Sequence, residues 1–299
     1  MPELPDVTVY IESLESRLIG QPLERIEIKN PFLLRTAEPP LTEFEGKRVR
    51  ALRRLGKRVA IQFEGDLWLV FHLMIAGRFH WSPDHKGKIR PPIALLRFAN
   101  GTLTLTEAGT KRRASLHAVR GERGLDDHDR GGLEVLDASF ETFNARIHES
   151  NHTLKRALTD PAIFSGIGNA YSDEILHRAR LSPLLQTKFL DDARARTLYV
   201  AVRESMKEWT QRLREIAGKE FPEGVTAFRE GMAVHGRYCK PCPVCGTDIQ
   251  RIRYAENETN YCPRCQTDGK LLADRSLSRL LKDDWPKTID MLENKRRGD

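Results

Sequence analysis

Four cysteines in the last quarter of the chain constrain its fold more than any other feature. Cys242, Cys245, Cys262 and Cys265 form a C-x2-C-x16-C-x2-C array. Two tight turns then each present a pair of thiolates, and the hairpin between them closes a tetrahedron, as in a structural zinc site. Four thiolates leave no open position for a catalytic water. The array therefore predicts one structural Zn²⁺ ion in a finger over residues 234–268.

The fifth cysteine creates an ambiguity in this pattern. Cys239 and Cys242 are also separated by two residues, but only Cys242 and Cys245 share the C-P-x-C turn of the second pair. We therefore interpret Cys239 as a free thiol. All five cysteines lie between residues 239 and 265, which favours a metal site over a disulfide framework.

Hydrophobic periodicity predicts a β-rich N-terminal part. Residues 7–18 carry apolar side chains at helical spacing, and Gly20 follows as a stop signal. Between residues 22 and 118, short β-type runs alternate with polar, glycine or proline breaks: LERIEI, VAIQF, LWLVFH, IALLRF and TLTLT. This pattern predicts a β-sandwich or barrel. The fold class is thus expected to be multidomain α+β, with a β-sandwich and its helix in residues 1–120.

The remainder of the chain is predicted to be mainly helical. The charged, glycine-rich stretch 121–132 is typical of a linker. Helices are expected over residues 133–222, and the clearest begins near Asp191, a good N-cap residue, and ends before Gly218. The finger follows, and residues 269–299 form a C-terminal tail without a recognisable motif.

The charge of the chain is compatible with a polyanionic partner, but many basic proteins bind no nucleic acid. The net charge is +7 and the isoelectric point is near 9.2. Seven of the fifteen residues from 46 to 60 are basic, which suits either a track along a nucleic-acid backbone or simple solubility. No window reaches eighteen apolar residues, and the start MPELPDVTVY is acidic. We expect a cytoplasmic monomer that does not associate with membranes.

The second residue, Pro2, is a candidate nucleophile. Removal of Met1 before such a small residue would leave a secondary amine as the α-amino group. An α-amino group titrates near pH ~8, so a usable fraction is neutral at physiological pH. Glu3 lies beside it. Taken alone this start is weak evidence, because many chains begin this way and the same residues can simply start a helix.

Together with three other motifs, this N-terminus resembles the formamidopyrimidine-DNA glycosylase and endonuclease VIII family. MPELPDV is similar to the start of that family, Lys57 within LGKRVAI to its β-domain lysine, and FSGIGNAYSDEIL (164–176) to its helix, two-turn, helix signature. The finger completes the set. The resemblance covers about residues 2–268, and four motifs in the right order are highly specific. It implies two domains, 1–120 and 133–222, with DNA bound in the cleft between them.

The resemblance implies a bifunctional DNA glycosylase and AP lyase acting on damaged double-stranded DNA. Pro2 would attack C1′ of a damaged nucleotide that is flipped out of the duplex, and the strand would then be cut by β,δ-elimination. Glu3 would move protons, and Lys57 would supply a cation to the DNA backbone. Asp6, where the family more usually has a glutamate, would support the proline nitrogen.

Other residues are expected to hold DNA, with one departure from the family. Asn169 offers an amide in the two-turn loop, and Lys155 is a further DNA-binding candidate and, with Lys57, an alternative nucleophile. The finger arginine of the family falls at Asn257, which lacks charge and a bidentate fork. Either Arg251 or Arg253 compensates, or DNA binding is weakened.

The residues that would fill the void left by a flipped base also differ from the family. Met74, Ile75 and Arg112 or Arg113 are available for this wedge, but no phenylalanine is. The stretch 218–236 is too short for the long loop that caps 8-oxoguanine in the purine branch. We therefore expect a preference for formamidopyrimidines, oxidised pyrimidines or abasic sites.

Two other functions stay open at this point. A catalytically weak protein that binds damaged DNA would keep the fold and the zinc, and Asn257 favours it. An RNA- or ribosome-associated zinc protein would share the helical module and the finger but would not need a free N-terminal proline. Pro2 and Glu3 favour the enzyme.

Overall fold

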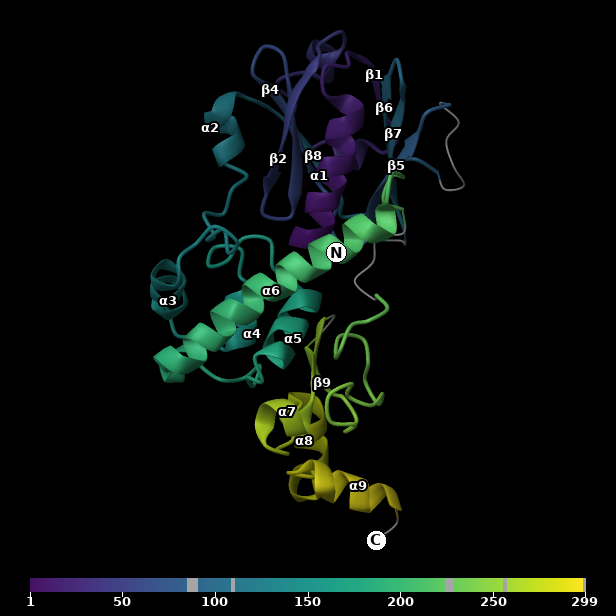
Figure 1. Cartoon of the computed structure of the whole chain (residues 1–299). Helices are drawn as coiled ribbons and strands as arrows, with labels where there is room; N and C mark the ends of the chain where they lie inside the picture. The colour runs from purple at the N-terminus through teal and green to yellow at the C-terminus, as the bar shows by residue number, and fades with distance from the viewer. Residues whose placement is uncertain (85–90, 109–110, 224–228, 255–256, 298–299) are drawn as a thin grey trace. The chain divides into compact units, whose positions relative to one another are not determined.

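The computed structural model describes residues 1–84, 91–108, 111–223, 229–254 and 257–297, with only the backbone for residues 254, 257, 275–277, 283, 296 and 297. The chain forms two compact units, which are considered separately (Figure 1). Unit 1 comprises Met1–Gly132 and Lys207–Ala227, and unit 2 comprises Leu133–Met206 and Phe228–Asp299.

The described strands of unit 1 form two four-stranded antiparallel sheets. The first has the order β1 (Leu23–Ile28), β6 (Ala94–Phe98), β7 (Gly101–Glu107), β5 (Gly77–Ser82). The second has the order β2 (Val49–Leu55), β3 (Arg58–Phe63), β4 (Leu67–His72), β8 (Ser115–Arg120). One core joins them, with Phe79 and Leu96 from the first sheet and Ile61 and Phe71 from the second. The predicted β-sandwich is confirmed.

Helix α1 (Leu4–Leu18) belongs to the same core. Val7, Tyr10, Leu14 and Leu18 recur at intervals of three and four residues and are fully buried. The helix contacts β2 and β3, and it ends at Leu18, with Ile19 as its C-cap before Gly20. Because one face of the helix is part of the sandwich, the position of the N-terminus is set by the core. Two short 3-10 helices, η1 (Pro31–Leu33) and η2 (Leu41–Phe44), complete this region.

The stretch that was predicted to be a linker is partly folded. Residues Gly121–Asp126 form helix α2, and Leu125 is buried in a small cluster with Trp68 and Val70 of β4. This cluster lies on the face of the second sheet away from the main core, because Trp68 and Val70 alternate with the core residues Leu69 and Phe71. The segment through Gly132 belongs to unit 1.

Unit 2 begins with the predicted helices. They are α3 (Phe140–His148), α4 (Leu154–Thr159), α5 (Asn169–Arg178), η3 (Thr187–Phe189) and the long α6 (Asp192–Ala217). The side chain of Asp191 accepts a hydrogen bond from the Arg194 N–H at 2.9 Å, which confirms it as the N-terminal cap of α6. From Lys207 onward, α6 belongs to unit 1.

The finger and the tail complete unit 2 (Figure 1). The hairpin of β9 (Gln250–Tyr254) and β10 (Asn257–Tyr261) is followed by α7 (Pro263–Thr267). The tail forms α8 (Arg275–Leu281), η4 (Lys282–Asp284) and α9 (Ile289–Arg297), so it has more structure than the sequence indicated. The sequence-based domain ranges stay predictions. Within the described ranges, no helix is long and apolar enough to cross a membrane.

Candidate functional site

The N-terminus is held by a reciprocal cap on α1. The Glu3 N–H donates to Asp6 Oδ2 at 2.8 Å, and the Glu3 carboxylate accepts from the Asp6 N–H. Pro5, in the first turn, has no N–H to satisfy. A cap of this kind contributes about 1 kcal/mol. Glu3 and Asp6 are only 2% and 4% exposed, and Pro2 is buried beside them. The cap therefore fixes the residue next to Pro2.

Two cations lie near the α-amino group. Burial lowers the pKa of the amine of Met1; the carboxylates of Glu3 and Asp6 oppose this, whereas Arg78 and Lys57 lower it further. Lys57 lies in the turn between β2 and β3, one residue after Gly56. The φ of 58° at Gly56 is left-handed and therefore favours glycine. The cluster thus contains the predicted Lys57 and also Arg78, which the sequence analysis missed.

The predicted wedge residues lie on a tight turn between β4 and β5. The Gly77 N–H donates to Leu73 O at 2.8 Å, and a Cβ at Gly77 would lie 2.3 Å from that oxygen, so the turn requires glycine. Met74 has a left-handed φ of 52°, and Ile75 is 57% exposed. Arg78 Nη1 donates to Ile75 O at 3.0 Å and to Gly77 O at 2.6 Å. Arg78 therefore links this turn to the N-terminal cluster.

A second loop adjoins the turn. Glu107, the last residue of β7, is paired with Gly77 of β5. Its Oε1 accepts hydrogen bonds from the backbone N–H groups of Arg113 at 2.7 Å and Ala114 at 3.0 Å. Arg112 and Arg113 are exposed. The structure thus brings both predicted wedge segments to one end of the same sheet, and Glu107 is the residue that holds the second one.

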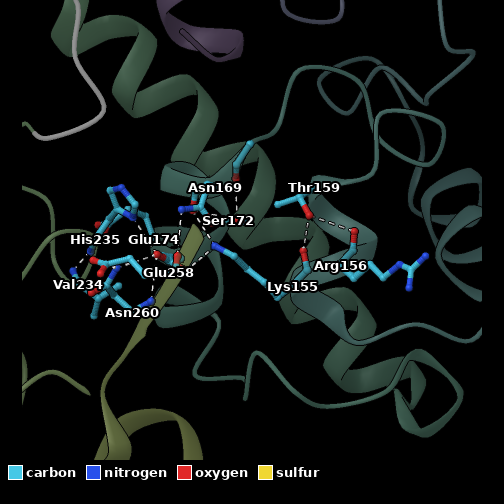
Figure 2. A network of polar contacts seen from close by, with 12 residues as sticks. Lys155, Arg156, Thr159, Asn169, Ser172, Glu174, Val234, His235, Glu258 and Asn260 are labelled. Carbon is cyan, nitrogen blue, oxygen red and sulfur yellow. Dashed lines mark hydrogen bonds and ion pairs between the residues drawn. The ribbon is translucent and has the colours of Figure 1, made fainter. Parts of the chain in front are cut away.

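In unit 2, Asp173 of α5 is the centre of a buried polar network, and its partners Lys155, His235 and Asn260 are labelled in Figure 2. Its Oδ1 accepts from Lys155 Nζ at 2.5 Å, and its Oδ2 lies 2.8 Å from His235 Nδ1 and 3.1 Å from the Asn260 N–H. Lys155 Nζ also donates to Asn169 O at 2.7 Å. The Lys155 side chain is 12% exposed, so this predicted DNA-binding cation is bound within the protein.

Neighbouring residues of α5 hold two other segments of unit 2. Asn169 Nδ2 donates to Glu258 O of β10 at 2.9 Å (Figure 2). The Glu174 carboxylate accepts the N–H groups of Ala233, Val234 and His235 at 2.7 to 2.9 Å. Burial raises the pKa of Glu174, and the three N–H donors oppose this rise. Asp173 and Glu174 stand within FSGIGNAYSDEIL, so the signal was present, but sequence reasoning gave them no role.

The three finger residues considered for DNA contact differ in their surroundings. The Arg251 guanidinium lies 4.1 Å from the Tyr238 ring centroid, and Nη1 lies 3.4 Å from a Glu258 carboxylate oxygen. Arg253 is exposed. Asn257 begins β10, opposite Tyr254, and its side chain lies outside the described part of the structure.

The four predicted zinc ligands converge at one point. Their sulfur atoms all lie within 4.8 Å of one another, with Cys245 and Cys262 at 3.4 Å and Cys242 and Cys265 at 3.9 Å. Tetrahedral Zn–S bonds of about 2.3 Å place neighbouring sulfurs about 3.8 Å apart, so the set fits zinc. Burial and the neighbouring sulfurs raise the pKa of Cys265 to about 11, and a bound cation would offset this. Cys239 is exposed and outside this group.

Three known families match successive parts of the chain. They are described as the formamidopyrimidine-DNA glycosylase N-terminal domain (1–116), the formamidopyrimidine-DNA glycosylase H2TH domain (132–215) and the zinc finger found in FPG and IleRS (240–267). The matches end before the tail.

Individual relatives cover most of the chain. Formamidopyrimidine-DNA glycosylase of Heliobacterium modesticaldum is 32% identical over 281 residues, which cover 89% of this chain and 100% of the relative. The crystal structure of the MutM (Fpg) protein of Thermus thermophilus has a TM-score of 0.74 and 33% identity, and covers 89% of this chain and 98% of that one. A Lactococcus lactis Fpg bound to DNA with an abasic site shares the fold, with a TM-score of 0.78 at 24% identity and coverage of 89% and 99%.

Proposed function

Because this chain belongs to the formamidopyrimidine-DNA glycosylase family, we propose that it removes oxidised or ring-opened bases from DNA and then cuts the strand as an AP lyase. One observation carries this proposal: burial lowers the pKa of the half-buried α-amino group, and the charges of Glu3, Asp6, Lys57 and Arg78 act on it. A low pKa makes an amine a nucleophile at neutral pH. Removal of Met1 would transfer this role to the secondary amine of Pro2.

The proposed base removal uses only the residues of this cluster. The neutral Pro2 nitrogen attacks C1′ of the flipped nucleotide, so an N–C1′ bond forms while the bond from C1′ to the base breaks. Glu3 moves the protons of this step, in the first instance to open the sugar ring at its oxygen. The departing base takes up a proton, and the opened sugar remains attached to Pro2 as a cationic iminium.

Strand cleavage follows from the same intermediate. The iminium acidifies the neighbouring C2′ hydrogen, and loss of that proton expels the phosphate at C3′. A second elimination, with loss of a proton from C4′, expels the phosphate at C5′. These steps need phosphates that are held still. We propose that Lys57 contacts the backbone beside the lesion. The zinc holds the finger in shape and takes no part in the chemistry.

The proposed DNA contacts take account of the surroundings of each side chain. Met74, Ile75, Arg112 and Arg113 would fill the gap that the flipped base leaves. In the finger, Arg253 is the better substitute for the missing family arginine, because Arg251 already interacts with Tyr238 and Glu258. Asn169 would act near phosphate, and Lys155, which is paired with Asp173, would position it through the hydrogen bond to Asn169 O.

The proposed substrate preference rests on the 218–236 region and on the composition of the wedge. We propose formamidopyrimidines, oxidised pyrimidines and abasic sites in preference to 8-oxoguanine, since the 218–236 region is short and the wedge lacks a phenylalanine. Side-by-side excision assays on duplexes that differ only in the lesion would test this. Faster excision of 8-oxoguanine opposite cytosine would contradict it.

Borohydride trapping tests the nucleophile. Protein with a free Pro2 should form a covalent adduct with an abasic-site duplex, whereas protein with an N-terminal extension should bind the duplex and form none. Glu3→Gln should lower base excision by roughly 10²- to 10⁴-fold and affect cleavage of a preformed abasic site much less. Trapping by the extended protein would refute the Pro2 mechanism and point to Lys57. Binding without any adduct in the free-Pro2 protein would instead indicate a damage-binding protein.

A further inference from the structure

A histidine of α5 lies against one of the zinc ligands. His177 Nε2 is 3.3 Å from Cys242 Sγ, and the two side chains belong to residues 65 positions apart in the chain. His177 is 7% exposed and Cys242 is 3% exposed, so water does not compete for this contact. The geometry is within the range expected for an N–H donor and a sulfur acceptor.

The contact between His177 and Cys242 allows a single directed hydrogen bond. A neutral imidazole carries one N–H, and a thiolate has only acceptor capacity toward nitrogen. The hydrogen must therefore reside on Nε2 if the contact to Cys242 is a hydrogen bond.

A second buried side chain links the other cysteine pair to the same region. Gln266 Oε1 accepts the Cys262 N–H at 2.8 Å, and Gln266 Nε2 donates to Leu181 O at 2.9 Å. Leu181 follows α5 by three residues. Gln266 is 6% exposed. Each cysteine turn is thus joined by one buried polar contact to the C-terminal end of α5 or the residues just after it.

The N-terminal end of α5 holds the hairpin between the cysteine pairs. Asn169 donates to Glu258 O (Figure 2). Asp173 accepts the Asn260 N–H. Helix α5 therefore contacts the finger near both of its ends: the hairpin near its beginning and the Cys242 sulfur near its end. The finger is built onto this helix and does not form a separate module.

We propose that His177 is an outer-sphere ligand of the zinc, donating Nε2–H to the Cys242 thiolate, and that it couples metal binding to the packing of α5. Such a donor spreads the thiolate charge and fixes the sulfur, and loss of an outer-sphere partner typically lowers metal affinity about 10- to 100-fold. Since α5 also carries Asn169, loss of the metal would loosen a proposed DNA contact. The proposal needs zinc at the four cysteines and does not need the Pro2 mechanism.

Zinc affinity tests the proposal directly. His177→Phe keeps a ring of similar size and removes the donor, whereas His177→Gln keeps an N–H at similar reach. Competition with a chromophoric chelator should give the Phe variant a zinc affinity about 10- to 100-fold lower, and the Gln variant one within a fewfold of the original protein. His148→Phe is the control and should leave the affinity unchanged, because the hydrogen bonds of His148 in the described part of the chain go to Asn144 O and Leu190 O. Equal affinities for the Phe variant and the original protein would overturn the proposal.

A measurement on the unaltered protein keeps the proposal testable if His177→Phe does not fold. With NMR-active cadmium in place of zinc, the Nε2 hydrogen of His177 should show scalar coupling to the metal through the Cys242 sulfur. Either an Nδ1–H tautomer or the absence of this coupling would contradict the hydrogen bond. Neither result depends on DNA cleavage, so failure here is distinguishable from failure of the proposed enzymatic activity.

Discussion

At the scale of single residues, Arg78 interacts with two groups that are far apart in the sequence, the turn of Met74 and Ile75 and the α-amino group. Its guanidinium holds the turn of Met74 and Ile75 through two carbonyl oxygens, and its charge lowers the pKa of the α-amino group. A residue that holds the turn of the proposed wedge and acts electrostatically on the α-amino group is well placed to align these two parts of the proposed site. It acts through these groups and is therefore a positioning residue.

We predict that Arg78→Met shifts the pH profile of strand cleavage to higher pH. Removing a nearby cation raises the pKa of the amine, so a smaller neutral fraction is present at neutral pH. Cleavage of a preformed abasic site should therefore slow near pH 7 and recover in alkaline buffer. Arg78→Lys keeps the charge and serves as the control. An unchanged profile in Arg78→Met would show that the charge has no part in tuning the amine.

Two histidines of the second sheet are also informative at this scale. Burial, aided by Arg58 and Lys57, lowers the pKa of His72 from 6.5 to about 4. Burial, aided by His128, Arg58 and Arg35, lowers that of His117 from 6.5 to about 4. The charged and titratable neighbours that shift these histidines are all basic, so the folded state resists their protonation.

This arrangement predicts a loss of stability in mild acid. Between pH 6.5 and about 4 the unfolded chain binds protons that the folded chain does not, so the free energy of unfolding must fall as pH decreases through this window. Chemical denaturation at a series of pH values should show that the free energy of unfolding depends less on pH in His72→Gln than in the original protein. An identical slope of unfolding free energy against pH in both proteins would show that His72 does not cause the loss of stability.

At the scale of secondary-structure elements, the tail is attached to the finger by hydrogen bonds between backbone N–H groups and side-chain oxygens. Asp274 Oδ2 accepts the Arg253 N–H of β9 at 2.8 Å, and the Leu272 N–H donates to Tyr261 Oη of β10 at 2.8 Å. Within the tail, the Ile289 N–H donates to Gly269 O at 2.8 Å. Asp274 is 4% exposed. The tail thus occupies hydrogen-bonding groups of both hairpin strands.

We predict that Asp274→Ala destabilises the hairpin that carries Arg253. The change leaves a backbone N–H without its acceptor, at a cost of about 1–3 kcal/mol if the group stays buried. Hydrogen exchange at β9 and β10 should become faster, while exchange in the sheets of unit 1 should not change. Asp290→Ala, which removes an exposed ion pair with Arg264, is the matched control in the tail. Equal protection of the hairpin from hydrogen exchange in both variants would show that Asp274 does not stabilise it.

At the scale of the whole molecule, charge is the property that acts on DNA at a distance. The chain has 49 basic and 42 acidic residues, and the arithmetic gives the net charge of +7. Several basic side chains are nevertheless bound internally, as the buried pair of Lys155 and Asp173 shows. Breaking such a pair by removing one partner costs about 3–5 kcal/mol, so Lys155 contributes to the structure of unit 2 regardless of DNA.

We predict a steep salt dependence of binding to a lesion duplex. A protein that neutralises about six to ten phosphates loses roughly 10³- to 10⁵-fold in affinity between about 50 and about 200 mM salt. Arg253→Gln should lower the slope of log affinity against log salt by about one. Lys29→Gln, which removes an exposed charge paired with Glu27, should leave the slope unchanged. Binding that does not respond to salt would refute the phosphate contacts as a whole.

Features encoded by neighbouring residues were predictable from the sequence alone. The spacing of Cys242, Cys245, Cys262 and Cys265 is local within each pair, and the structure brings the four sulfurs together as expected. The α1 helix and the β-sandwich follow from periodicities of 3.6 and 2, which each segment carries by itself. Strands β2, β5 and β8 were not predicted individually, because their polar and small residues weaken the alternation.

Only the tertiary structure decided which polar groups become partners. Asp173 and Lys155, His177 and Cys242, and Asp274 and Arg253 are separated by 18, 65 and 21 residues, respectively. No local pattern identifies such pairs, because each depends on how whole elements pack. The same is true of Leu125, whose apolar side chain binds a charged segment to the second sheet. The sequence by itself determined the family, the metal site and the identity of the nucleophile candidate, whereas long-range burial decided which charged side chains stay exposed and which are held inside the protein.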